Sequence, residues 1–427
     1  MIDLDRHVVK VGGFSHFLSV EQTDRYLTQL HLDADGLVQR NTIGHSRAGQ
    51  PLHLMSVGQG ERHALVIGMP HPNEPTGTLA ALRLVEVLIG DCELTAALGL
   101  TWHVLPCADP DGARLNEGWF SGPYTREHYA TNMYRPPFAE QFEWTFHRDD
   151  LATPGLPPTP ESHAVMSVMD ALKPELVVTM HNSEASGLYC YLTDPHAEFA
   201  AHLEQVAISA TLPIGIGEFE GAAEPLAPGV FRTAPSLAGA SMLCSTDYAA
   251  RYGALGITVE APLWAVPESA DPRPAGPSAA SLVRELGRAR AVLCEQYGQW
   301  ISTITQELRL TEVAQSMLTG ARPFDGDWLP GDSLDPGQLS VAALSALTSG
   351  VELECLRAAG SVVRVLHQST GTRASHRLRA VQQEATSAIA SWSAKASRPN
   401  VKFVGLAESV RAHVGITLAG ASVISAD

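Results

Sequence analysis

The chain has 427 residues, of which 45% are hydrophobic and 18% charged, so wholesale disorder is excluded and a large core can form. Its 29 lysines and arginines against 46 aspartates and glutamates give a net charge of −17. A surface this acidic repels phosphate backbones and anionic lipids, so we expect neither a nucleic acid nor a membrane as a partner.

The first residues, Met1–His7, are polar and acidic and lack the apolar stretch of a signal peptide. No apolar run reaches the roughly 18 residues that a membrane span needs. The six cysteines are scattered without a CxxC pair, which is typical of reduced thiols. These features predict a cytoplasmic protein.

Short apolar runs alternate with helical patterns over the first two thirds of the chain. The runs that predict strands lie at residues 63–69, 101–105, 176–180, 188–192 and 256–259. The patterns that predict helices lie at 75–89, with Pro75 in the first position, and at 160–172. Strands separated by helices predict an α/β fold with a layered sheet. Residues 109–160 show no period and are rich in Pro, Gly, Asn and aromatic residues, which predicts a long functional loop.

From about residue 276 the pattern becomes helical. Residues 278–308 predict one long helix, and three further helical stretches follow at 340–365, 374–394 and 406–414. We expect an all-α appendage. The sequence is compatible with three roles for its helices and does not choose among them: packing on the α/β domain, forming the interface of a homo-oligomer, or limiting access to a cleft.

His71 and Glu74 stand three residues apart in the segment HPNE, directly after a predicted strand and before a predicted helix. Ligands bind at strand ends of α/β sheets, and histidine nitrogen and glutamate oxygen are ordinary zinc ligands. The spacing alone is weak evidence, because it occurs again in the segment HNSE from His181 to Glu184. For Glu184 we expect an exposed position, and the alternative is a side chain that supports a metal ligand or contacts the substrate.

Two more candidates end predicted strands. His181 follows the apolar run at 176–180, and Glu260 follows the one at 256–259. A catalytic zinc site commonly has three protein ligands and a water, so His71, Glu74 and His181 can supply the three. A carboxylate such as Glu260 is costly to bury unless it is paired or functional, and near a zinc-bound water it can take and return a proton.

Together these pieces resemble the M14 zinc carboxypeptidases. That family carries HxxE at its first strand–helix junction, then an Asn-Pro-Asp-Gly-like loop, a distant histidine and a Thr-x-Glu segment. This chain has HPNE at 71–74, DPDG at 109–112, His181, and TVE at 258–260, in that order. The resemblance covers roughly residues 40–310.

The resemblance implies an α/β fold with a mixed, twisted sheet of about eight strands flanked by helices. It divides the chain into a catalytic domain, 1–310, and a helical C-terminal region, 311–427. It also implies one zinc ion per chain, held by His71, Glu74 and His181, with Glu260 as the general acid/base.

The arginines are harder to place. The family uses an arginine after the Asp-Gly loop to stabilise the oxyanion, and here the candidates are Arg114 and Arg126, between which spacing does not decide. The family binds the terminal carboxylate of the substrate with an adjacent Asn-Arg pair, which this chain lacks. Asn132 and Arg135, two residues short of adjacent, are the candidates, because a guanidinium matches a carboxylate with two hydrogen bonds.

We therefore expect a zinc metallocarboxypeptidase that removes the C-terminal residue of a peptide. The form His-x-Asn-Glu-x-Thr-Gly at residues 71–77 also looks like the aspartoacylase and succinylglutamate desuccinylase branch. An amidohydrolase acting on N-acyl amino acids is therefore the alternative. A binding protein without catalysis is disfavoured, because the expected zinc ligands and the base are all present.

Overall fold

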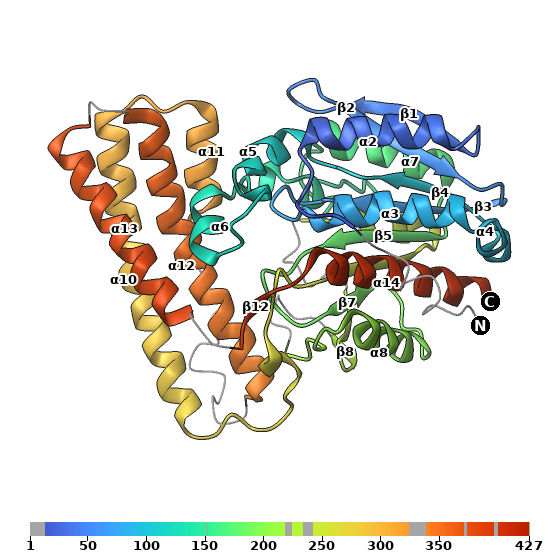
Figure 1. Cartoon of the computed structure of the whole chain (residues 1–427). Helices are drawn as coiled ribbons and strands as arrows, with labels where there is room; N and C mark the ends of the chain where they lie inside the picture. Colours follow the sequence, from blue (N-terminus) through green and yellow to red (C-terminus); the bar gives the residue numbers. More distant parts are fainter. Residues whose placement is uncertain are drawn as a thin grey trace.

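The computed structural model describes residues 13–151, 153–217, 224–233, 242–323, 339–370, 374–396 and 400–426. The N-terminal segment Met1–His7, on which part of the predicted location depends, lies outside this range. A sheet with flanking helices lies beside a cluster of long helices (Figure 1). None of the described helices combines the length and the hydropathy that crossing a membrane requires.

The main sheet has nine strands among the described residues, in the order β1-β2-β4-β3-β5-β10-β7-β9-β8. Their bounds are β1 Val38–His45, β2 Pro51–Val57, β3 Arg62–Gly68, β4 Leu100–Leu105, β5 Leu176–His181, β7 Tyr189–Leu192, β8 Glu224–Ala227, β9 Val230–Arg232 and β10 Leu255–Glu260. The central strands β4, β3, β5 and β10 are parallel, whereas β1, β2, β7 and β8 each have an antiparallel neighbour. The predicted mixed sheet is confirmed.

Helices cover both faces of this sheet. The side chains of β3 alternate between two cores: Ala64 and Val66 face one, and Leu65 and Ile67 face the other. The first core is covered by α3 (Thr76–Gly90), α8 (Phe199–Ala210) and α14 (Leu406–Ala426), and the second by α7 (Pro160–Leu172) and α9 (Ser245–Ala249). A strand buried on both faces needs apolar residues at every position, which is why these strands are visible in the sequence as continuous apolar runs.

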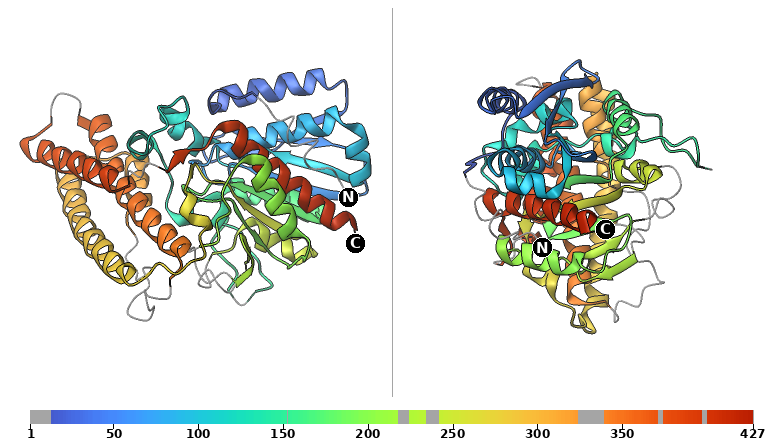
Figure 2. Two further views of the ribbon diagram at one scale, coloured as in Figure 1. Left: turned by 60° about the horizontal axis from the view of Figure 1, so that its bottom comes forward. Right: turned by 90° about the vertical axis from the view of Figure 1, so that its right-hand side faces the viewer.

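Four helices form a second body, the helical cluster: α10 Ser278–Glu307, α11 Glu312–Gly320, α12 Val341–Thr370 and α13 His376–Ala396. They share a core of their own, to which Trp300, Leu356 and Trp392 contribute. Figures 1 and 2 show this cluster at one end of the molecule.

The predicted boundary at residue 310 does not separate the two cores. Helix α10, which precedes it, packs in the helical cluster, and α14, which follows it, packs on the sheet. In Figure 2, α14 lies along the sheet beside the ribbons of α3 and α8. We propose to divide the chain by packing, into the helical cluster and a sheet region that includes α14.

Helix α14 is also longer than the sequence pattern predicts, because it ends at Ala426 rather than near residue 414. Its buried residues lie all around the helix, so no amphipathic period marks its second half. Gly420 faces β10, and a side chain there would collide with Ile257.

The region 109–160 is not one loop, contrary to the prediction. It contains α5 (Pro110–Phe120), α6 (Arg126–Asn132) and the short helices η1 (Phe138–Glu140) and η2 (Phe142–Trp144). Capping side chains start the two longer helices: Asp109 accepts from the Gly112 N–H at 2.8 Å, and Thr125 from the His128 N–H at 3.2 Å. Helices this short show too few turns for a hydrophobic period.

The remaining elements complete the sheet region. They are α2 Val20–Asp33, α4 Cys92–Leu98, η3 Ala250–Tyr252, η4 Pro267–Ala270, and a small sheet of β6 Ala185–Ser186, β11 Trp264–Ala265 and β12 Lys402–Phe403. In the chain, β6 follows β5 and β11 follows β10. The small sheet therefore lies next to the ends of the strands that carry His181 and Glu260.

Candidate metal centre

Two neighbouring strand ends bring the predicted zinc ligands together. His71 and Glu74 lie in the turn between β3 and α3, and His181 is the last residue of β5. Because β3 and β5 are adjacent and parallel, their carboxyl ends share one edge of the sheet. Gly77, at the start of α3, allows this turn to sit close to β5, because a side chain there would collide with the Met180 carbonyl.

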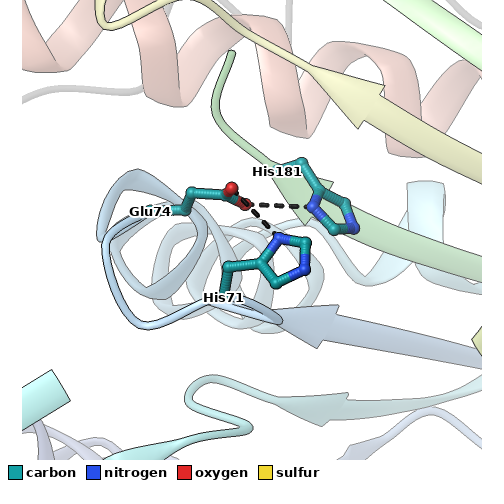
Figure 3. Close-up of side chains that lie close together, drawn as sticks. All are labelled: His71, Glu74 and His181. Atoms are coloured by element: carbon teal, nitrogen blue, oxygen red, sulfur yellow. Dashed lines mark hydrogen bonds and ion pairs between the residues drawn. The ribbon is translucent and has the colours of Figure 1, made fainter. Parts of the chain in front are cut away.

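The three side chains converge on one point (Figure 3). The Nδ1 atom of His71 lies 3.0 Å from Glu74 Oε1, and the Nδ1 atom of His181 lies 3.0 Å from Glu74 Oε2. One donor atom from each residue lies within 4.8 Å of the others, and all three residues are buried. The carboxylate thus stands between two imidazoles that present the same nitrogen to it.

Burial and neighbouring charge set the protonation of this group. Burial, followed by the charge of Arg135, lowers the pKa of His71 to about 3, so its imidazole is neutral and able to ligate a metal. Burial by itself would raise the pKa of Glu74. The interactions with His71 and His181 are together larger and hold that pKa well below its usual range. Burial by itself would lower the pKa of His181. The interactions with Glu74 and the other neighbouring carboxylates are together larger and raise the pKa of His181.

This donor set fits zinc. Two imidazoles and a carboxylate are a common ligand set of catalytic zinc sites, which keep the fourth position for water or substrate. The donors are buried, polar and mutually within coordination reach, whereas a structural site would add a fourth side chain. Among the described residues, no other group of three such side chains comes this close together.

Glu260 lies beside the three donors. It is the last residue of β10 and pairs in register with His181 on β5. Its Oε1 atom is 3.9 Å from His181 Nδ1, and the residue is only 7% exposed. The carboxylate is therefore placed where it can exchange a proton with a molecule bound at the metal centre.

Hydrogen bonds from outside the motifs hold this edge of the sheet together. Asn182 Nδ2 donates to the Ala261 carbonyl at 2.9 Å, and Asn182 Oδ1 accepts from the Thr76 N–H at 3.2 Å. His413 of α14 lies 2.8 Å from the carbonyl of His181 through its Nε2 atom. Asn182 is visible in the sequence beside His181, but His413 has no motif or spacing that could have found it.

Sequence analysis also missed Glu143 of η2. Its Oε1 atom accepts from the Ser245 hydroxyl at 2.8 Å and lies 3.8 Å from His181 Nε2. At this distance Glu143 places a negative charge beside the buried imidazole without a hydrogen bond to it. The next residue, Trp144, places its ring 6.1 Å from that of His71, so η2 lies beside the metal centre.

Of the three predicted arginines, only Arg135 contacts the metal centre. Its guanidinium lies 3.1 Å from Glu74 Oε1 and 3.0 Å from both ring nitrogens of His71. Arg114 pairs instead with Glu21 at the surface.

The other two predicted side chains are also engaged elsewhere. Arg126 is buried against the helical cluster, where it lies 3.5 Å from Glu352. Asn132 bonds within its own helix, donating to the His128 carbonyl at 2.9 Å. The structure therefore does not bring Arg126 or Asn132 to the metal donors.

Glu184 is not exposed, contrary to the prediction. Its side chain is 15% exposed and accepts hydrogen bonds from Tyr129 and Arg357. Two such donors stabilise a carboxylate that the sequence alone places in a loop.

The zinc carboxypeptidase family model matches residues 23–216. This match includes His71, Glu74 and His181 but not Glu260, whose place rests on the register of β10. At the level of the family, the predicted resemblance, the class of zinc peptidase and the zinc ion are confirmed. No curated protein matches the chain.

Solved structures give low similarity. Bovine thrombin-activatable fibrinolysis inhibitor, solved with tick carboxypeptidase inhibitor, is 13% identical, with a TM-score of 0.40 over 57% of this chain and 86% of the other. A metallo-carboxypeptidase from Burkholderia cenocepacia is 16% identical, with a TM-score of 0.37 over 57% and 60%. A metallo-carboxypeptidase from Pseudomonas aeruginosa, in complex with (2-guanidinoethylmercapto)succinic acid, is 19% identical, with a TM-score of 0.37 over 57% and 60%. This chain therefore spans 60% of each bacterial protein.

Proposed function

We propose, from the premise that residues 23–216 belong to the zinc carboxypeptidase family, that this protein is a zinc-dependent metallocarboxypeptidase that hydrolyses the C-terminal peptide bond of a peptide. The observation that supports this most is the convergence of His71, Glu74 and His181 with Glu260 only 3.9 Å from His181. These residues combine a three-ligand metal site with a carboxylate base.

Each residue has a distinct task in this proposal. His71, Glu74 and His181 hold the zinc ion, which when bound lowers the pKa of a water and polarises a carbonyl. Glu260 takes the proton of the attacking water and returns it to the leaving amine.

We assign the stabilisation of the oxyanion to Arg135 rather than to Arg114 or Arg126. A group that stabilises this charge must lie beside the metal, where the scissile carbonyl binds, and Arg135 contacts both Glu74 and His71. Its side chain is 22% exposed, so a substrate can reach it.

The same observation keeps a deacylase of N-acyl amino acids as the second candidate. If Arg135 stabilises the oxyanion, neither of the other predicted arginines is near enough to the metal to bind the carboxylate of a peptide end. The α-carboxylate of an N-acyl amino acid lies in the same position relative to the scissile amide as that of a peptide end, so both candidates need this recognition and differ in the acyl group that they accept. For both candidates the substrate is an amide that carries a carboxylate. The cytoplasmic location stays a prediction.

Matched substrates separate the two candidates. The zinc-loaded protein is assayed on a peptide library with free C-termini, on the same library with amidated C-termini, and on a panel of N-acyl amino acids. We expect release of free C-terminal residues that stops when the C-terminus is amidated or when zinc is removed with a chelator. Faster hydrolysis of N-acyl amino acids identifies a deacylase, and full activity in the metal-free protein contradicts both candidates.

A further inference from the structure

A single tyrosine hydroxyl joins the two turns that carry the metal ligands. Tyr129 of α6 donates to Glu184 Oε1 at 2.6 Å and accepts from Asn73 Nδ2 at 2.9 Å. Asn73 lies between His71 and Glu74 in the first turn, and Glu184 lies three residues after His181 in the second. A displacement of the hydroxyl therefore acts on both turns.

The helical cluster supplies the last member of this chain of hydrogen bonds. Arg357 of α12 donates through Nη1 to the same Glu184 oxygen at 3.0 Å. Glu184 is thus held from two sides, by Tyr129 of the sheet region and by Arg357 of the helical cluster. Losing the arginine would leave a largely buried carboxylate without its counter-charge, which is strongly destabilising for that carboxylate.

The backbone around these residues is closely packed, so the link is stiff. Tyr129 is 1% exposed, and its ring lies between those of Trp119 and Trp264, at 4.9 and 5.4 Å. Gly360, one turn after Arg357, meets the backbone of α6: a side chain there would collide with the Ala130 carbonyl. Figure 1 shows α6 between α12 and the sheet.

Burial strengthens each bond of this link. Burial raises the pKa of Tyr129 well above its ordinary value, so the hydroxyl stays protonated and donates to Glu184. A hydrogen bond to an ionised group is worth about 1.5–3 kcal/mol, roughly twice a neutral one.

We propose that Arg357 is a positioning residue of the zinc site, which acts through Glu184 and Tyr129 on the turns that carry His71, Glu74 and His181. The helical cluster is thereby a working part of the metal centre. This inference rests on the zinc site of the proposed function but not on its substrate.

The test measures zinc affinity of the full-length protein by competition with a chromophoric chelator. Changes to hydrogen-bonding residues behind metal ligands typically weaken metal affinity by 10–100-fold, so we expect Arg357→Met to weaken zinc binding by about tenfold. Arg357→Lys, which keeps the charge, should recover part of this loss.

Arg290→Met is the matched control. Arg290 forms a buried pair with Glu354 on the same helix α12, at 2.6 and 2.9 Å, but contacts neither metal-bearing turn among the bonds the structure gives. We expect it to lower thermal stability while leaving zinc affinity within about twofold of wild type. Equal loss of zinc affinity in the two variants would mean that α12 only stabilises the fold, and would overturn the proposal.

A second variant keeps the test informative if Arg357→Met does not fold. Tyr129→Phe retains the ring and its packing but removes the hydroxyl, and should also weaken zinc binding by about tenfold. Unchanged zinc affinity in Tyr129→Phe or in a folded Arg357→Met refutes the inference. A wild-type protein that binds no zinc refutes the proposed function instead, so the two failures are distinguishable.

Discussion

The sheet region and the helical cluster treat their buried charges differently. In the helical cluster the buried pair Arg290–Glu354 joins one cation to one anion through two hydrogen bonds. At the sheet edge His71, Glu74 and His181 gather at one point. Paired charges hold helices in register, whereas gathered donors are costly to bury and are kept where they bind something. The contrast identifies the sheet edge as the chemical part of the molecule.

The largest effect that this contrast predicts is at Glu260. Glu260→Gln removes the proton acceptor but none of the three metal donors, so turnover should fall by about 10²–10⁴ while zinc content stays unchanged. Metal analysis and hydrolysis rates on one preparation check this. His71→Ala is the comparison, because it should lose both zinc and activity. Turnover of Glu260→Gln equal to wild type would remove Glu260 from the proposed mechanism.

A change at the Arg290–Glu354 pair of the helical cluster, which lies away from the metal-bearing turns, should affect stability rather than chemistry. Arg290→Met leaves the buried Glu354 without its partner and should lower the free energy of unfolding by roughly 3 kcal/mol. Denaturant unfolding measures this loss. A fall in turnover of the remaining folded protein would show that the two regions do not differ as we describe.

The pH dependence of stability should sharpen the contrast further. Burial raises the pKa of Asp109 to about 7, although its bond from the Gly112 N–H works in the opposite direction. The folded protein therefore holds this proton over a range in which an unfolded aspartate, with a pKa near 4, has lost it. The contribution of Asp109 to the free energy of unfolding is fully present below pH 4. It is lost as the pH rises to about 7, by up to about 1.4 kcal/mol per pH unit.

Asp109→Asn isolates this contribution. Asparagine still accepts from the Gly112 N–H but does not titrate, so the variant should lose the part of the pH slope that Asp109 supplies. Unfolding of both metal-free proteins at several pH values between 4 and 7 gives the difference. Identical slopes in the two proteins would contradict the raised pKa.

The smallest effect is expected at Arg114. Its side chain is 37% exposed and pairs with the half-exposed Glu21, and exposed ion pairs contribute less than about 1 kcal/mol. Arg114→Gln should leave stability and kcat nearly unchanged, whereas Arg135→Gln should lower kcat. A large loss of kcat in Arg114→Gln would return the oxyanion role to Arg114.

The sequence predicts the metal donors because they depend on local rules. His71, His181 and Glu260 each follow an apolar strand, and parallel neighbours place such ends on one edge of the sheet. No comparable rule places Arg135 or Glu143. Arg135 lies in the irregular segment after α6, and Glu143 lies in a short helix. Their positions follow from tertiary packing alone.

The fold follows the same division. The central strands were predictable to within about two residues, because burial on both faces leaves continuous apolar runs. The packing partners of α10 and α14 were not predictable, because the apolar residues of a helix do not indicate which core the helix packs against. His413 and Arg357 depend on that packing, and so lie beyond sequence patterns.

The return of α14 to the sheet has a consequence for how the protein is made. The nascent chain completes β5 and β10 long before α14, so the part of their apolar face that α14 covers is exposed while the helical cluster is synthesised. Exposed sheet of this kind is prone to aggregate and to bind chaperones. Translation must therefore run through the cluster before the carbonyl of His181 can meet His413, and pausing within the cluster would lengthen the exposure.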